Sequence, residues 1–225
     1  TFAQAELSGA PWSPSELRER IVTFVACYSR TWTPAQRSVV KATSLVSELA
    51  ARLLSMAPDA RALLMTVRPE SYLATILGGP NSRKELAQAA PARLARLHRR
   101  LGRAMWRIED LSEGECAAMS WACEMSALTA ASENGPDRVL WIDFDEFLGD
   151  VPAGLAAALA ALGRTASPQD VQNMATSAYL QRYSKAPEYA YGPEWRRQAL
   201  AAARLEHHDE IRRGLRWLEA AAAEP

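Results

Sequence analysis

Short apolar runs alternate with longer helical patterns along this chain. Apolar runs that end abruptly in polar residues lie within 36–43, 61–67 and 139–144. Such runs are typical of parallel strands that are covered on both faces. Helical patterns separate the three runs, and a strand–helix–strand connection is a right-handed crossover that produces a parallel sheet. The pattern therefore predicts a helix-rich α/β protein with helices on both faces of a parallel sheet.

Helix signals surround these strands. Ser13 and Pro14 are typical of an N-cap and a first-turn proline, and they predict a helix that ends near Ser29. Ser44 is a candidate N-cap for the next helix, and Pro58 marks the turn that follows it. Further helices are predicted over 69–77, 83–108, 113–132, 153–162 and 171–183, followed by a tyrosine-rich loop at 187–193. Residues 194–222 are predicted to form one final amphipathic helix or a helix pair.

Length and composition indicate a single domain. The chain has 225 residues, of which 48% are hydrophobic and 23% charged, enough for one substantial core. We expect one domain over 1–225, divided into an N-terminal helical segment (1–35), an α/β core (36–165) and a C-terminal helical segment (166–225). Three strands are few for a parallel sheet buried on both sides. Because the sequence also begins with Thr1, we expect that the first βα unit of the domain is missing.

Charge and cysteine content exclude several classes of protein. Lys plus Arg and Asp plus Glu are both 26, so no overall field attracts nucleic acid or a membrane surface. Cys27, Cys116 and Cys123 show no CxxC spacing, which indicates neither a disulfide framework nor a zinc site and fits a reducing cytoplasm. No apolar run is long enough to span a membrane, and no signal peptide is visible.

Two cations mark the candidate site. Lys41 ends the first predicted strand, and Arg68 ends the second. The carboxyl ends of parallel strands meet at one edge of a sheet, so we expect these side chains to lie side by side. Helix N-termini at the same edge add N–H groups and a positive dipole end. The arrangement predicts a site for a strongly anionic group such as phosphate or sulfate.

The order of motifs over 36–165 resembles the PAPS-dependent sulfotransferase family, whose fold is P-loop-like. The motifs are Lys41-Ala42-Thr43, then Pro58-Asp59-Ala60, an apolar strand, Arg68-Pro69-Glu70-Ser71, long helices, a strand ending in Asp143 to Leu148, and Leu162-Gly163. The first of these is similar to the family's strand-end Lys-x-His or Lys-x-Ser segment. The fourth is similar to its Arg-Asp-Pro element.

This resemblance implies roles for five residues. Arg68 and Thr75 would hold the 3′-phosphate of 3′-phosphoadenosine 5′-phosphosulfate (PAPS), the cosubstrate, and Lys185 would cover the same phosphate. Lys41 would neutralise charge at the bridging oxygen, and Thr43 occupies the position of the family's catalytic base. The implied reaction transfers a sulfuryl group to a hydroxyl or amine of a small-molecule, glycan or lipid acceptor, without a metal. Such a transfer depends mainly on positioning and on cations that stabilise developing charge.

Two departures from the family pattern are visible. The family's phosphosulfate loop, of the Arg-Ser-Gly-Thr-Thr type, has no counterpart here, because the segment from Ser8 to Ser13 carries no Lys or Arg. Thr43 stands where many relatives have a histidine, and threonine does not accept a proton near neutral pH. We expect the missing unit upstream of Thr1 to supply both functions; otherwise the chain binds without catalysing.

Each candidate also has a structural interpretation. Lys41 is as suited to pairing with an acid at the sheet edge as to binding a ligand. Thr75 within a helix commonly donates to a backbone carbonyl. The acids Asp143, Asp145 and Glu146 are more typical of pairs with arginine than of a metal site. Arg68 differs, because a cation at a helix start opposes the dipole and so favours an anionic partner.

A second hypothesis concerns the basic helix 93–107. Arginines recur there every three or four residues, at Arg93, Arg96, Arg100, Arg103 and Arg107. A solvated surface helix, with His98 also in solvent, is the default interpretation. The functional alternative is a noncatalytic adaptor of the same fold that presents this stripe to an acidic protein partner. A kinase-like P-loop enzyme is a third hypothesis, and it requires a Gly-rich Lys-Ser/Thr loop upstream.

Overall fold

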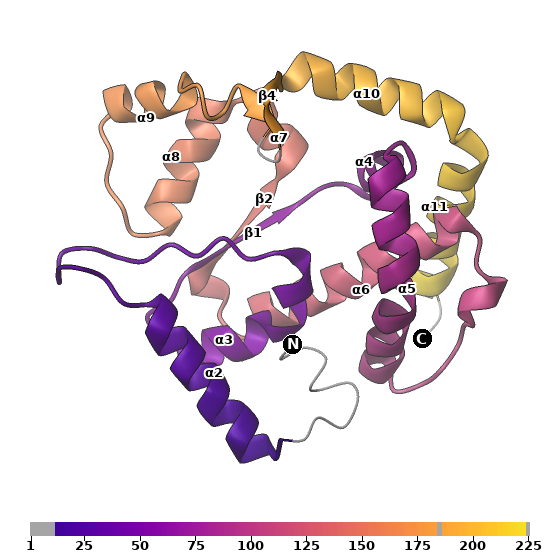
Figure 1. Ribbon diagram of the computed structural model, residues 1–225, viewed down its shortest axis with the longest axis horizontal. Coiled ribbons are helices and arrows are strands. Elements are labelled where there is room, and N and C mark those ends of the chain that lie inside the picture. The colour runs from indigo at the N-terminus through magenta and orange to yellow at the C-terminus, as the bar shows by residue number, and fades with distance from the viewer. Residues whose placement is uncertain (1–11, 184–185, 224–225) are drawn as a thin grey trace. The chain divides into compact units, whose positions relative to one another are not determined.

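The computed structural model describes residues 12–183 and 186–223 (Figure 1). The chain divides into two compact units. The N-terminal unit contains Thr1–Arg61 and Glu124–Arg138, and the main unit contains Ala62–Cys123 and Val139–Pro225. Helices account for 69% of the protein, and the strands form a two-stranded parallel sheet and a short hairpin. The helix-rich α/β class predicted from the sequence is therefore confirmed.

The N-terminal unit begins with helix α2 (Pro14–Tyr28), as the capping signal predicted. The Ser13 hydroxyl accepts a hydrogen bond from the Glu16 amide at 3.3 Å, and the Ser13 amide donates to the Glu16 carboxylate at 2.7 Å. This reciprocal pair satisfies two amides that the first helical turn leaves without partners. The 3₁₀ turn η1 (Ser44–Leu49) and helix α3 (Ala50–Met56) follow.

The strand predicted over 36–43 does not form, and that prediction is wrong. These residues are exposed coil, and the Val39 side chain is 81% exposed. A strand is stable only when a neighbour satisfies its amides and carbonyls, and no described strand pairs with this segment. An apolar run of two valines beside Arg37 and Lys41 offers too little surface to recruit such a neighbour.

Arg138 closes the N-terminal unit. Helix α6 (Glu113–Glu133) ends before the breaker predicted around Gly135, and the 3₁₀ turn η3 (Pro136–Arg138) follows. One guanidinium nitrogen of Arg138, Nη1, then lies within hydrogen-bond distance (3.0–3.3 Å) of four backbone carbonyls, those of Leu54, Ala57, Pro58 and Ala60. The turn after α3 is thereby fixed to a segment far away in the sequence.

The main unit contains the parallel sheet. Strand β1 (Ala62–Thr66) pairs with β2 (Val139–Asp143), in a register that places Leu64 opposite Trp141 and Thr66 opposite Asp143. Side chains alternate between faces along a strand, so Met65 and Trp141 lie on opposite faces. They are 52% and 36% exposed, respectively. The described residues therefore leave both faces of this small sheet partly open.

Helix α4 (Pro69–Leu77) is central to the helical core. It contacts α5 (Pro80–Leu101), α10 (Pro193–Glu206) and α11 (His208–Ala223) (Figure 1). Buried apolar side chains fill the spaces between these helices and the first half of α6: Leu73, Ala74, Leu77, Leu86, Leu94, Met119, Leu200, Ile211 and Trp217. Burial of this apolar surface is the main force that fixes α4, and with it the segment that follows β1.

The remaining elements lie between β2 and α10. They are helices α7 (Phe144–Gly149), α8 (Val151–Ala161) and α9 (Pro168–Ala175), and the antiparallel strands β3 (Arg182–Tyr183) and β4 (Ala186–Ala190). The sequence placed a helix over 171–183 and a loop over 187–193. Both boundaries are wrong, because strand β3 includes the end of the predicted helix and strand β4 includes the start of the predicted loop.

No helix within 12–183 or 186–223 combines the length and the apolar character needed to cross a bilayer.

Candidate functional site

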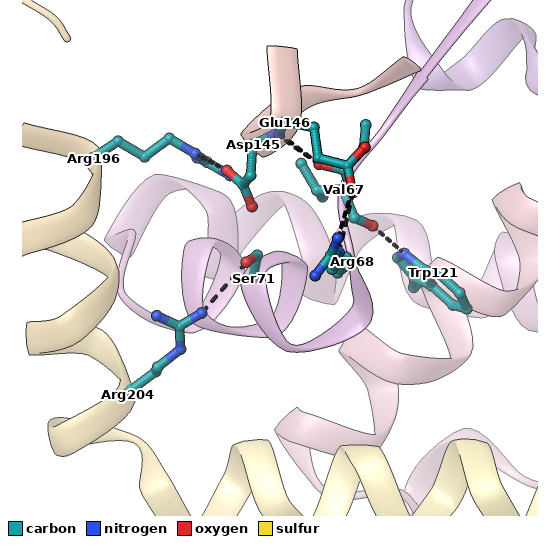
Figure 2. Close-up of polar contacts among 9 residues, drawn as sticks. Val67, Arg68, Ser71, Trp121, Asp145, Glu146, Arg196 and Arg204 are labelled. Carbon is teal, nitrogen blue, oxygen red and sulfur yellow. Dashed lines mark hydrogen bonds and ion pairs between the residues drawn. The ribbon is translucent and has the colours of Figure 1, made fainter. Parts of the chain in front are cut away.

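Arg68 lies where strand β1 turns into helix α4. Its backbone is extended (φ −59°, ψ 150°) and it is the N-cap residue of α4, with Pro69 in the first turn. The indole Nε1 of Trp121, on α6, donates a hydrogen bond to the carbonyl of Val67 at 3.0 Å (Figure 2). Proline and this bond fix the turn, while the Arg68 side chain stays 68% exposed. The sequence prediction of a cation at a strand end and helix start is confirmed for this residue.

Two carboxylates of the neighbouring turn face Arg68. Its Nη2 donates to Glu146 Oε1 at 2.5 Å, and its Nε lies 3.6 Å from Asp143 Oδ2. The other oxygen of Asp143 caps helix α7, accepting from the amides of Asp145 and Glu146 at 2.8 and 3.0 Å. The hydrogen bond that Arg68 donates to Glu146, and then the negative charges of Glu146 and Asp143, raise the pKa of Arg68. The interpretation of these acids as partners of arginine is therefore correct.

A second set of contacts involves Asp145 and Ser71. The Arg196 guanidinium, on α10, donates from Nε to Asp145 Oδ1 at 2.5 Å (Figure 2). The Ser71 hydroxyl, on α4, accepts from Arg204 Nη2 at 3.4 Å, and hydrogen bonding with Ser71 helps to lower the pKa of Asp145. Arg204 Nε lies 2.7 Å from a carboxylate oxygen of Glu70. These contacts join the first turns of α4 and α7 to α10.

Burial and hydrogen bonding have opposite effects on the pKa values of Asp145 and Arg196. Burial raises the pKa of Asp145, but the hydrogen bonds with Arg196 and Ser71 and the charges of Arg196 and Arg204 together leave that pKa below the ordinary value. Burial likewise lowers the pKa of Arg196, but the hydrogen bond and charge of Asp145, together with Tyr191, leave that pKa above the ordinary value. Both groups are therefore charged at neutral pH.

Thr75 lies on α4, seven residues after Arg68 and therefore about two turns further along the helix on the same side. It is exposed, and its hydroxyl donates to the Ser71 carbonyl at 2.7 Å. This hydrogen bond is the structural role that the sequence suggested for a threonine within a helix.

The predicted sheet edge that would carry both Lys41 and Arg68 is not formed. Lys41 and Thr43 are exposed in the coil of the N-terminal unit, whereas Arg68 belongs to the main unit. The sheet edge expected to bring Lys41 beside Arg68 does not exist, because 36–43 is not a strand. That expectation is corrected. Lys185 lies outside the described residues.

The predicted cationic stripe over 93–107 is broken. Helix α5 ends at Leu101, because Gly102 adopts a left-handed backbone with φ 70°. Arg96 is only 4% exposed, and Arg100 donates to the Cys123 carbonyl at 3.1 Å. Two of the five arginines therefore point inward, and Arg103 and Arg107 lie beyond the helix. The prediction of one continuous helical stripe is wrong.

His98 is not a solvated residue, as the sequence had suggested. Its Nε2 accepts hydrogen bonds from the amides of Met105 and Trp106, both at 3.3 Å. Its ring stacks on Trp106, which packs against Trp217. The histidine holds the chain that leaves α5 against the core.

Arg196 and Arg204 are the site residues that sequence reasoning missed. The signal was present: both lie four residues from Leu200, on the apolar side of the predicted final helix. An arginine on the buried face of an amphipathic helix requires a carboxylate or a polar partner. Only the fold identifies Asp145 and Ser71 as those partners.

A hollow of about 290 Å³ adjoins the site. It is bounded by β2, α7 and α8, and its lining includes Trp141, Asp143, Glu146 and Phe147. Two of these residues are the carboxylate partners of Arg68. Among the described residues, no group of histidine, cysteine, aspartate or glutamate side chains is placed to hold a metal ion.

Comparison with known proteins gives no further constraint. The chain matches no family model, no curated protein and no solved structure.

Proposed function

We propose that this chain binds the 3′-phosphate of PAPS at Arg68 and is a P-loop-like sulfotransferase. The observation that carries the proposal is Arg68 itself, an exposed guanidinium held at the junction of a parallel strand and helix α4. The first amides of α4 have no carbonyl partner within the helix, and they add donors and a positive dipole end. A planar guanidinium beside such a terminus suits a doubly charged phosphate.

Glu146 and Asp143 do not exclude this ligand. Arg68 and Glu146 are both 68% exposed, and exposed ion pairs contribute little to stability because water screens them. A phosphate dianion interacts more strongly with a guanidinium than a single carboxylate does. Binding therefore exchanges one partner of Arg68 for another.

The remaining roles follow from the order of motifs in the sequence. Thr75 would add a neutral donor to the phosphate, and Lys185 a further cation. Lys41 would act at the bridging oxygen with Thr43 beside it, in the transfer of a sulfuryl group to a hydroxyl or amine acceptor. Three cysteines without a disulfide are consistent with a reducing, cytoplasmic setting for this reaction.

The broken stripe disfavours the adaptor hypothesis. An adaptor needs an exposed row of arginines, whereas Arg96 and Arg100 point into the main unit. The nucleotide-binding hypothesis keeps its principal residue exposed. We therefore prefer it.

Titration calorimetry with adenosine 3′,5′-bisphosphate tests the proposal. The wild-type protein should bind this nucleotide, and Arg68→Ala should weaken binding by roughly tenfold or more, because a charge-assisted bond to the phosphate is lost. Arg107→Ala is the matched control. Arg107 is also an exposed N-cap arginine, of the 3₁₀ turn η2 (Ile108–Asp110), and it pairs with Glu109.

Equal affinity of wild type and Arg68→Ala would refute the assigned role. Glu146→Gln provides an independent check, because it removes the competing carboxylate and leaves Arg68 in place. Its affinity for the nucleotide should rise, by up to about fivefold. A fall in affinity would indicate that Glu146 orients Arg68 rather than competing with the phosphate.

A further inference from the structure

Arg196 and Arg204 form one connected network with Ser71 and Asp145. The two arginines lie on the same face of α10, on either side of the buried Leu200. Arg196 donates to Asp145, and Arg204 donates to the Ser71 hydroxyl (Figure 2). Hydrogen bonding with Ser71 also contributes to the lowered pKa of Asp145. Three helices, α4, α7 and α10, are thus connected through four side chains.

Stability alone is a poor explanation for this network. The Arg196 side chain is only 11% exposed, and its guanidinium lies 5.0 Å from the ring centre of Phe144. Removing a cation from water costs free energy that a single carboxylate repays only in part, and apolar residues often stabilise such a position as well or better. A buried, hydrogen-bonded pair does, however, fix the relative position of the elements that carry it.

The elements that this network fixes are those that form the site. Ser71 is in the first turn of α4, which Arg68 caps. Asp145 is in the first turn of α7, between Asp143 and Glu146, the two partners of Arg68. Arg196 and Arg204 contact Asp145, Ser71 and Glu70 rather than Arg68 itself. Their influence on Arg68 therefore passes through these residues.

We propose that Arg196 and Arg204 are positioning residues for the anion site at Arg68. They hold the first turns of α4 and α7 at a fixed separation, which sets the distance between the Arg68 guanidinium and the two carboxylates. They also fix the direction of the α4 amides toward the ligand. This inference rests on the proposed function, because the ligand it concerns is the phosphate at Arg68.

The main test measures affinity for adenosine 3′,5′-bisphosphate below the unfolding temperature of each variant. Arg196→Ala should weaken binding by roughly tenfold, the scale seen when outer partners of a binding group are removed. Arg196→Lys keeps the charge and should restore part of the loss. Arg197→Ala is the matched control, because Arg197 is the next residue on α10, is 75% exposed and pairs only within its own helix, with Glu194. It should bind as the wild type does.

A double-mutant cycle identifies the route. If Arg196 acts through Asp145, the variant carrying Arg196→Ala and Asp145→Asn should bind no more weakly than the weaker single variant. If the two substitutions weaken binding independently, so that their fold-changes in affinity multiply, the proposal is wrong. A folded Arg196→Ala protein with wild-type affinity would also overturn it, because a purely structural residue changes stability but not affinity. If Arg196→Ala does not fold, Arg204→Ala and Arg196→Lys carry the same test.

Amide hydrogen exchange separates this inference from the proposed function. If the wild-type protein binds no nucleotide, the proposed function fails, yet the network still makes a prediction. The amides of Tyr72 and Leu73 in α4 should exchange faster in Arg196→Ala than in wild type, and Arg197→Ala should leave them unchanged. Unchanged exchange in Arg196→Ala would overturn the positioning role as well.

Discussion

At the scale of single residues, polar side chains next to the core decide how this protein is organised. Trp121, Arg138 and His98 each bond to backbone groups that the helices and strands leave unsatisfied. Asp145 differs, because it is charged, partly buried and held by two donors. Substituting a residue of this kind lowers the free energy of unfolding more than substituting an exposed charge does. The reason is that water does not reach the buried partner and cannot take over the lost hydrogen bond.

Asp145 should make the protein sensitive to acid. Its pKa is lower in the folded state than in the unfolded chain, where an aspartate titrates at about 3.9. The charged form therefore contributes stability above that pH, and the contribution is lost as the pH falls through the folded pKa. Asp145→Asn should lower the free energy of unfolding at pH 7 by about 2 kcal/mol.

Urea unfolding at two pH values measures this effect. The difference in stability between wild type and Asp145→Asn should shrink from pH 7 to about pH 3, because protonation of Asp145 imitates the substitution. Glu16 offers no suitable comparison, since its own pKa is also lowered. A difference that stays constant between the two pH values would show that folding does not lower the pKa of Asp145.

At the scale of elements, close contact between helices depends on glycine. A Cβ added to Gly214, on α11, would lie 2.4 Å from Leu73 Cδ2 and 2.5 Å from the carbonyl oxygen of Gly114. Both distances are far shorter than real contacts allow. The helices α4, α6 and α11 therefore pack at a separation that only a hydrogen side chain permits at this point.

Gly214→Ala should destabilise the main unit. Overpacking typically costs about 1–3 kcal/mol, which exceeds the roughly 1 kcal/mol that alanine contributes through helix propensity. Gly149→Ala, at the end of α7, is the control, because nothing lies within 4 Å of its added Cβ. Thermal unfolding should show a lower midpoint for Gly214→Ala alone. A midpoint equal to that of wild type would mean that the helices separate without cost.

Local signals predicted the elements better than their ends. The capping box at Ser13, Pro69 after Arg68 and the breaker around Gly135 mark boundaries that the structure confirms. The sequence predicts that helix α5 continues to residue 108, because arginines and apolar residues keep the helical periodicity beyond Gly102. The left-handed conformation of that glycine ends the helix, and periodicity does not report backbone conformation.

At the scale of the whole molecule, the two units gather segments that are distant in the sequence. The N-terminal unit takes residues 124–138 from the middle of the chain, and the main unit begins with β1. Arg138 carries much of this long-range connection in the N-terminal unit, through its bonds to the carbonyls after α3. Its loss should therefore affect one unit more than the other.

Arg138→Ala should loosen the N-terminal unit selectively. Four carbonyls lose a charged donor, so local stability around 54–60 should fall by about 1–3 kcal/mol. Hydrogen exchange should become faster in α3 and remain unchanged in the core of α4. Arg37→Ala is the control, since Arg37 donates only to nearby loop carbonyls such as that of Pro34. Faster exchange throughout the chain would show instead that the units unfold together.

The sequence by itself determined the α/β class, most helices and the position of Arg68, because these follow from periodicity, capping and strand-end chemistry that act over a few residues. Tertiary structure alone decided that 36–43 is coil, that Lys41 does not share a sheet edge with Arg68, and that Arg196 binds Asp145. Strand formation and buried ion pairs depend on partners that are distant in the sequence, and no local pattern contains that information.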